Sequence, residues 1–382
     1  MRHRRKDRRG VLLPVGATAA AAAVALAGAL LISMKSEDGT DADRNTSSAG
    51  PVARIDCAKQ GKVPGSGSTA QQNAMKRWIK EYEQACPGVR IAYNPLGSGA
   101  GVNQFLRGGF KAFGGTDGAL TPVDVERSRE VCPGGRAIDL PMVGGPIAIG
   151  YNLPDVDDLV LDAPTLAKIF DSRITRWNDP AIQKLNPGVV LPELPIQAVH
   201  RSDNSGTTQN LNAYLAGAAP AQWPYPAEKS WQGKGGSSAD GSDGVVSEVA
   251  STSGAIGYFE LSFATARKMD TVRIDTGAAE PVEASTTTAS AGIAAAEVIG
   301  KGKDLTLKFD YGTSAEGAYP IVLVTYEIVC DRGNDKEVLP ALKSFLAYTA
   351  SEEGQKILPE IHYAPLPENV AEQVREVVAT LS

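Results

Sequence analysis

The segment His-Arg-Ser-Asp-Asn-Ser-Gly-Thr-Thr-Gln, residues 200–209, places a guanidinium, several hydroxyls and a glycine in one short stretch. The residues Ile196–Val199 before it predict a strand, and Gln209–Leu215 after it predict a helix. A helix N-terminus presents unpaired backbone N–H groups and a positive potential, which favour an anion. Arg201 adds a planar set of donors that suits a tetrahedral oxyanion. The segment therefore predicts an anion site, and the alternative is an ordinary N-cap by Ser205 with the arginine in a surface ion pair.

Two earlier turns have the same character. Gly-Ser-Gly-Ser-Thr-Ala, residues 65–70, precedes a helix expected over Gln71–Ala85. Gly-Ser-Gly-Ala-Gly, residues 97–101, follows a strand expected over Val89–Tyr93 and precedes a helix from 102 to about 107. Each turn alone is compatible with simple capping, but three together predict helix ends that converge on one anion. No turn matches the phosphate loop of ATPases or the glycine motif of dinucleotide-binding folds.

These turns belong to a set of six segments that occur in order along the chain. The segments are Gly65–Thr69, Gly97–Gln104, Phe113–Asp117, Trp177–Ile182, Arg201–Thr208 and Gly254–Tyr258. In this set the chain resembles the phosphate-binding protein of bacterial high-affinity phosphate ABC transporters, from about Asp56 to the C-terminus. One departure is Ala70, where the family usually has an aromatic residue. Because that position contributes mainly a backbone N–H, binding is expected to survive the change.

The resemblance implies an α/β, two-lobed periplasmic-binding-protein fold of type II with a hinge. Lobe I is expected to comprise residues 52–149 and 258–382, and lobe II residues 150–257. The chain is expected to cross between the lobes near Val143–Tyr151 and to return near Ala255–Phe259. Further expected elements are helices at Thr165–Phe170, Pro180–Leu185 and Glu337–Thr349, a strand at Tyr319–Val329, and a surface loop at Gln232–Gly244.

The resemblance also implies the ligand set. Hydrogen-bond donors to phosphate are expected from Thr69, the backbone of Ala70, Ser98, Arg201, Ser205, Gly206 and Thr207. Asp117 is expected to accept a proton from phosphate, and it would repel sulfate, which carries no proton near neutral pH. The alternative for Asp117 is a helix cap or turn residue. Asp203 is expected to hold Arg201 in place or to cap the helix.

Two other functions compete with a phosphate receptor. A receptor for another oxyanion, such as sulfate or molybdate, would need no proton acceptor. The presence of Asp117 therefore favours a phosphate receptor over this alternative. An exported serine hydrolase could use Ser205 or Ser98, but His200 is expected to face away from Arg201, and no Gly-x-Ser-x-Gly occurs. The chain is therefore predicted to be no enzyme and to need no metal or cofactor. Whether it feeds a transporter or only senses phosphate stays open.

The N-terminus predicts export. A basic head, Arg2–Arg9, precedes an uncharged run, Gly10–Met34, so residues 1–34 read as a cleaved signal peptide or a membrane anchor, with the anchor favoured. No cysteine offers a lipid attachment site at the end of this run. Residues 35–51 are polar and predict a flexible linker. The expected location is extracytoplasmic and membrane-associated, with the permease and ATPase of an ABC importer as partners.

The net charge indicates which partners the protein does not bind, and the cysteines predict its disulfides. The net charge is −6 and no basic stripe occurs, which excludes nucleic acid as an expected partner. Four cysteines in an exported chain favour disulfides over free thiols. The start of the first strand and the end of the returning helix share an edge, which predicts Cys57–Cys86 and leaves Cys132–Cys330. A zinc site is not expected, because no Cys-x-x-Cys occurs.

Overall fold

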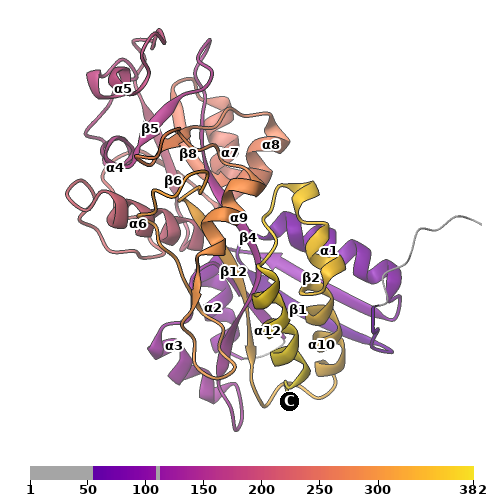
Figure 1. Ribbon diagram of the computed structural model, residues 1–382. Coiled ribbons are helices and arrows are strands. Elements are labelled where there is room, and N and C mark those ends of the chain that lie inside the picture. Colours follow the sequence, from indigo (N-terminus) through magenta and orange to yellow (C-terminus); the bar gives the residue numbers. More distant parts are fainter. Residues whose placement is uncertain (1–54, 109–111) are drawn as a thin grey trace, which may run out of the picture. The chain divides into compact units, whose positions relative to one another are not determined.

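One mixed sheet of eight strands organises the part of the chain that the computed structural model describes, residues 55–108 and 112–382 (Figure 1). Its strand order is β2-β1-β3-β12-β4-β8-β6-β7. The strands are β1 (Gly61–Gly67), β2 (Val89–Pro95), β3 (Phe113–Thr116), β4 (Ala137–Tyr151), β6 (Gln197–Arg201), β7 (Ser237–Ala239), β8 (Ala255–Glu260) and β12 (Val322–Cys330). There are also two separate two-stranded sheets in the described residues. One pairs β5 (Val160–Asp162) with β9 (Arg273–Asp275), and the other pairs β10 (Glu297–Val298) with β11 (Leu307–Lys308).

Helices cover the sheet at both of its ends. They are α1 (Gln72–Ala85), α2 (Ser98–Leu106), α3 (Pro122–Arg127), α4 (Ala163–Phe170), α5 (Pro180–Leu185), α6 (Gly206–Ala218), α7 (Gly241–Ser251), α8 (Leu261–Arg267), α9 (Thr286–Ala294), α10 (Leu339–Thr349), α11 (Glu352–Lys356) and α12 (Glu368–Ala379), with 3-10 turns η1 (Ser128–Glu130) and η2 (Pro359–Ile361). Helices α1 and α10 pack on β2 and β1, whereas α7 and α8 pack on β8 (Figure 1). The expected mixed α/β architecture is confirmed.

Strand β4 connects the two ends of the sheet. All 15 of its residues are buried, as expected of a strand covered on both faces. Its first part pairs antiparallel with β12, and its last five residues, Ile147–Tyr151, pair antiparallel with β8. The strands expected near 143–151 and 255–259 are therefore present and lie side by side. The lobe boundaries drawn from them remain a prediction.

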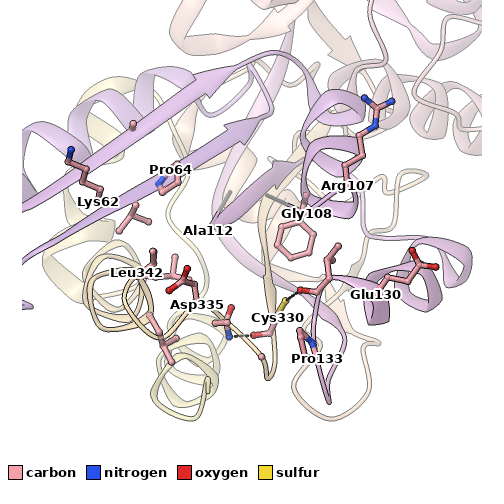
Figure 2. A pocket seen from close by; sticks show the side chains of 18 of the residues that line it. Lys62, Pro64, Arg107, Gly108, Ala112, Glu130, Pro133, Cys330, Asp335 and Leu342 are labelled. Carbon is pink, nitrogen blue, oxygen red and sulfur yellow. Dashed lines mark hydrogen bonds between the residues drawn. The ribbon is translucent and has the colours of Figure 1, made fainter. Parts of the chain in front are cut away.

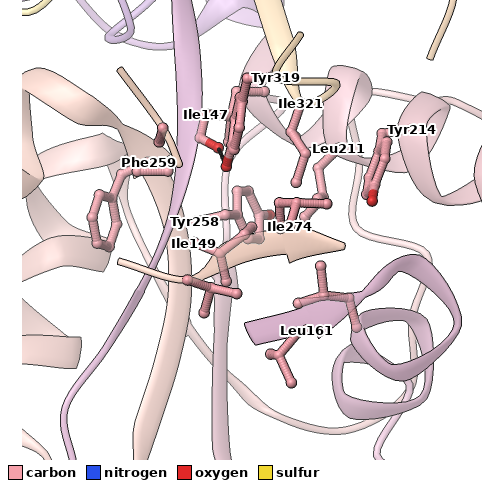
Figure 3. Packing of buried hydrophobic residues seen from close by; sticks show 14 of the residues in the cluster. Ile147, Ile149, Leu161, Leu211, Tyr214, Tyr258, Phe259, Ile274, Tyr319 and Ile321 are labelled. Atoms are coloured by element: carbon pink, nitrogen blue, oxygen red, sulfur yellow. Dashed lines mark hydrogen bonds between the residues drawn. The ribbon is translucent and has the colours of Figure 1, made fainter. Parts of the chain in front are cut away.

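Two large hydrophobic clusters lie along this sheet. One contains Trp78 of α1 and Phe345 of α10, beside β1 and the start of β4. The other contains Ile147 of β4, Tyr258 of β8 and the helices around them (Figure 3). Tyr319 joins the second cluster and donates its hydroxyl to the carbonyl of Ile147 at 2.9 Å. Residues from the last third of the chain thus complete the core at the strand that both ends of the sheet share.

Local sequence accounts for several helix starts. Asp162 caps α4 and Asp179 caps α5, each through a carboxylate that accepts a backbone N–H. Each cap is followed within two residues by a proline, which needs no N–H partner in the first turn. Thr121 and Asp124 form a reciprocal capping box on α3.

Two disulfides are present, with the pairing expected from the sequence. They join Cys57 to Cys86 and Cys132 to Cys330, and the Cα–Cα distance is 5.4 Å in each. Cys86 directly follows α1. Cys57 precedes β1 instead of starting it, so that part of the geometric argument is corrected.

Two expected assignments are wrong, because helical first turns were taken for loops. Helix α2 begins at Ser98 instead of Val102, whereas α6 begins at Gly206, directly after the expected cap Ser205. The stretch Gln232–Gly244, expected to be a loop, contains β7 and the start of α7. Glycine and serine read as loop residues in a sequence, but they are well tolerated in a first helical turn, where N–H groups have no helical partner. The N-terminal predictions, residues 1–34 and 35–51, lie outside the described residues. Within the described residues, no helix is both long and apolar enough to cross a bilayer.

Candidate anion-binding site

The turn between β6 and α6 forms the centre of the candidate site. Arg201 ends β6, and Ser205 caps α6 by accepting the N–H of Thr208 at 3.2 Å. The N–H of Ser205 itself donates to the carbonyl of Lys229 at 2.9 Å. The N-cap by Ser205, which the sequence offered as the alternative to an anion site, is therefore present. It occupies only one of the N–H groups that the start of a helix leaves unpaired, so it does not compete with anion binding.

Arg201 is buried and held by Asp203. Its Nε and Nη2 donate to the two carboxylate oxygens of Asp203 at 2.7 and 2.6 Å, and the residue is 2% exposed. The expected positioning role of Asp203 is confirmed, whereas the alternative of a surface ion pair is wrong. Burial alone would lower the pKa of Arg201, but the hydrogen bonds and charge of Asp203 outweigh it and raise that pKa. The remaining nitrogen, Nη1, lies 3.4 Å from Thr207 Oγ1 and 3.2 Å from Ser242 Oγ.

Asp117 lies just beyond β3 and is 3% exposed. Its Oδ2 accepts the hydroxyl of Ser98 at 2.9 Å, and its Oδ1 accepts the hydroxyl of Thr325 on β12 at 2.7 Å. Burial raises the pKa of Asp117, and these hydroxyl donors counteract the rise. The next helix, α3, is capped by Thr121, so the capping alternative for Asp117 is wrong.

Thr69 and Ala70 lie between β1 and α1. Thr69 Oγ1 is 3.1 Å from the hydroxyl of Ser242 and accepts the N–H of that serine at 3.3 Å. Ser242 is the second residue of α7, whose start the sequence did not mark as part of the site. The N–H of Ala70, expected to face the ligand, donates to Ser68 Oγ at 3.0 Å in this structure.

Glycine allows these turns to approach one another. A Cβ at Gly206 would lie 2.5 Å from Cβ of Asp117 and 2.6 Å from Oγ of Ser98, so a larger residue could not occupy this position. The N–H of Gly99 in α2 also donates to the carbonyl of Asn204, at 2.8 Å. The starts of α2, α6 and α7 and the turn before α1 therefore meet. All eight residues predicted to bind the ligand lie in or next to this contact network.

Sequence reasoning missed a second buried acid, Glu260, at the end of β8. It is 1% exposed, and its Oε1 accepts the hydroxyl of Thr207 at 2.7 Å. Its Oε2 is buried and has no hydrogen-bond partner among the described residues. Burial raises the pKa of Glu260, the Thr207 hydroxyl lowers it, and the charge of Asp117 raises it further. The only sequence signal was a carboxylate at the end of an apolar strand.

The site is rich in donors and poor in bases. His200, the histidine next to Arg201 in sequence, stacks its ring on Trp231 with centroids 4.8 Å apart, and its Nδ1 lies 3.0 Å from the carbonyl of Arg201. It therefore does not pair with Ser205 or Ser98 as a catalytic base would. In the part of the chain that the structure describes, no cluster of three or more metal-ligating side chains occurs.

A separate pocket of about 850 Å³ lies near the Cys132–Cys330 disulfide (Figure 2). Its apolar lining includes Phe105, Leu339 and Leu342. None of the predicted ligand-binding residues lines it, so it is not the candidate site.

Comparisons with known proteins agree with the class that the fold and site define, a solute-binding protein. The model of the PBP superfamily domain matches residues 52–353. The chain is 43% identical over 347 residues to phosphate-binding protein PstS 3 of Mycobacterium leprae, covering 90% of this chain and 92% of the relative. It is 41% identical over 366 residues to PstS 3 of Mycobacterium tuberculosis, covering 95% and 98%.

The fold also matches a solved structure of a phosphate-binding protein from Stenotrophomonas maltophilia, with a TM-score of 0.65. The identity is 19%, and the match covers 82% of this chain and 93% of the other. The chain belongs to the phosphate-binding proteins of the PBP superfamily.

Proposed function

We propose that the protein is an extracytoplasmic receptor that binds inorganic phosphate and delivers it to the permease and ATPase of an ABC importer. Its relatives at 41–43% identity are phosphate-binding proteins. The observation that carries the choice of ligand is Asp117, a buried carboxylate among donors at the meeting point of the helix starts. It is a binding protein and not an enzyme.

The residues that contact phosphate, in this proposal, are the eight that the sequence singled out. Thr69, the backbone at Ala70, Ser98, Ser205, Gly206 and Thr207 donate to phosphate oxygens, Arg201 supplies a charge-assisted bond, and Asp117 accepts a proton of the ligand. Hydrogen bonds between Arg201 and Asp203 support the role of the arginine, because they fix its orientation before the ligand arrives. The buried hydroxyls around Asp117 support its role, because they hold the carboxylate in one place.

The proposed receptor has two lobes, residues 52–149 with 258–382 and residues 150–257, that close around phosphate by hinge motion. The hinge would include β4 and β8. Contacts between the two sets of residues support this reading, since Thr69 meets Ser242 and Gly99 meets Asn204.

Residues 1–34 are proposed to tether the receptor to the membrane as a signal anchor, with 35–51 as a flexible spacer. The uncharged run Gly10–Met34 behind a basic head supports this proposal. The mass of the protein recovered from washed membranes tests it. A membrane-bound chain that retains Gly10–Met34 is expected, whereas a soluble chain lacking this segment would identify a cleaved signal peptide.

Calorimetric titration of the full-length chain in mild detergent tests the proposed ligand. One phosphate per chain is expected, with sulfate at least ~100-fold weaker because it offers Asp117 no proton. Equal affinity for both anions would favour the general oxyanion receptor. Turnover of a phosphate ester that disappears in Ser205→Ala would instead favour the hydrolase.

A further inference from the structure

Glu260 occupies a position in the site that the ligand set above does not use. It is the last residue of β8, paired across the sheet with Ile147 of β4. One carboxylate oxygen accepts the hydroxyl of Thr207, which is itself a proposed phosphate donor. The other oxygen is buried without a hydrogen-bond partner among the described residues. A buried carboxylate oxygen without a donor is costly when the group is charged.

The charges around Glu260 make its ionised form unfavourable while Asp117 is also ionised. Arg201 is the cation near it, but the charge of Arg201 is already balanced by Asp203. Asp117 contributes another negative charge, and Tyr363 from the C-terminal segment, whose hydroxyl donates to the carbonyl of Ala70, is also near enough for its charge to interact with that of Glu260. With Asp117 and Glu260 both ionised, an incoming phosphate would meet two uncompensated negative charges in a buried setting. One acid can relieve this repulsion by binding a proton.

The hydrogen bonds indicate which acid does so. Asp117 accepts hydroxyls from both Ser98 and Thr325, which stabilise its charged form. Glu260 accepts one hydroxyl within hydrogen-bond geometry, that of Thr207, and the nearby hydroxyl of Ser242 also lowers its pKa. The ionised form is therefore better supported at Asp117 than at Glu260.

We infer, building on the proposed function, that Glu260 takes up a proton from solvent when phosphate binds and becomes a hydrogen-bond donor in the wall of the site. A protonated Glu260 can donate to Thr207 Oγ1, which reverses the present hydrogen bond. The hydroxyl of Thr207 is then free to donate to phosphate. Glu260 is thus a positioning residue that acts through Thr207. The burial that raises its pKa acts in the same direction.

This inference has a definite sign. Because the complex holds one proton more than the free protein, phosphate affinity falls as pH rises through the range in which free Glu260 is ionised. The ionisation of phosphate itself also contributes to the pH profile. A variant that lacks only the Glu260 proton separates the two effects, since phosphate titrates identically in both proteins.

Glu260→Gln is that variant, because the amide donates to Thr207 as the protonated acid does and carries no charge. We expect calorimetry in two buffers of different ionisation enthalpy, from about pH 5 to about pH 9, to show up to about one fewer proton taken up per phosphate in Glu260→Gln than in the parent. Its affinity should fall by up to about tenfold less per pH unit than that of the parent. Glu228→Gln, at an exposed position, serves as the matched control and should behave as the parent.

Infrared difference spectra supply a second measurement, and its readout in the parent does not depend on the stability of Glu260→Gln. Addition of phosphate to the parent should produce a protonated-carboxyl band, and the band should be absent in Glu260→Gln. A parent that shows no such band, or a band that persists in Glu260→Gln, would overturn the inference. Identical proton uptake in the parent and Glu260→Gln at every pH would also overturn it. Failure of the proposed function is distinguishable, because the parent would then bind no phosphate at all.

Discussion

Arg201 donates two of its five N–H groups to Asp203 before any ligand arrives. Two of its nitrogens donate to that carboxylate, and only Nη1 lies toward Thr207 and Ser242. The arginine is therefore a preorganised group whose orientation depends on its partner. Affinity and stability should consequently change together when it is removed.

Arg201→Ala should weaken phosphate binding at least ~10-fold, because a charge-assisted hydrogen bond contributes about 1.5–3 kcal/mol. It should also lower the free energy of unfolding by about 3 kcal/mol, because Asp203 is left without its partner. Arg201→Lys keeps the charge but loses the planar set of donors, so its affinity for phosphate should lie between that of the parent and that of Arg201→Ala. Calorimetry and urea unfolding measure both quantities.

The double variant Arg201→Ala with Asp203→Ala separates the two effects. Removing the orphaned carboxylate should restore part of the stability and none of the affinity. Arg173→Ala breaks a half-exposed ion pair with Asp171 and serves as the matched control, with unchanged affinity. An unchanged affinity in Arg201→Ala would mean that phosphate binds elsewhere.

Asp117→Asn should reduce discrimination more than affinity. The amide has nearly the same volume, removes the charge and supplies an N–H donor to an unprotonated oxygen. The phosphate-over-sulfate ratio should fall at least ~10-fold, because a repulsive contact between like charges is lost. Competition titration near neutral pH measures the ratio. Asp124→Asn, in the exposed capping box of α3, is the control. If Asp117→Asn keeps the parent ratio, Asp117 is not the selectivity element.

Among individual residues, the sequence predicted those whose roles follow from the few residues on either side of them. Arg201 with Asp203 and the glycine turns could be found because each lies within a few residues of a helix start. Thr325, within β12, could not, because it reaches the site only through the pairing of distant strands. Ser242 and Glu260 do lie at the starts of α7 and α8, but only the docking of those elements brings them to Arg201 and Thr207. No local pattern encodes that pairing.

At the level of elements, the helix starts decide the site. Long helices with a clear apolar stripe, such as α1 with Trp78 and Tyr82, were predictable almost to the residue. Helices α2 and α7 start in glycine and serine, and their first turns were taken for loops. The same small residues that bring backbone close to a ligand also remove the apolar periodicity that marks a helix. Sequence patterns are therefore least reliable at the functional ends of helices.

The two disulfides should differ in their contribution to stability. Cys57–Cys86 closes a short span of 29 residues, and Cys132–Cys330 closes one of 198. On the chain-entropy model, removing Cys132–Cys330 by paired alanine substitution should cost about 2 kcal/mol more than removing Cys57–Cys86. Urea unfolding of the two double variants measures the difference. A larger loss on removing Cys57–Cys86 would contradict the loop-length argument.

For the whole molecule, the proposed hinge predicts that phosphate compacts the chain. Small-angle scattering of the receptor should show a smaller radius of gyration with saturating phosphate than without it. Sulfate at the same concentration is the control and should produce no change. Scattering curves that coincide with and without phosphate would indicate a site that binds without lobe closure.

Phosphate should also raise the unfolding temperature, because a ligand that binds only the folded state stabilises it by about 2.7 kcal/mol at 100 times its Kd. At the same phosphate concentration the rise should be about half as large or smaller in Arg201→Ala, because the affinity of that variant is at least ~10-fold weaker. Differential scanning calorimetry measures it. A parent protein whose unfolding temperature is insensitive to phosphate would contradict the proposed ligand.

The order in which the chain is made adds a consequence of the sheet topology. Strand β12 lies between β3 and β4, although about two hundred residues separate its sequence from theirs. The sheet around β1 and β3 therefore cannot be completed until the chain has been synthesised past Cys330. Until then β3 and the first part of β4 lack their shared neighbour and remain open edges. A chain that ends before β12 therefore exposes strand edges that can pair with another chain.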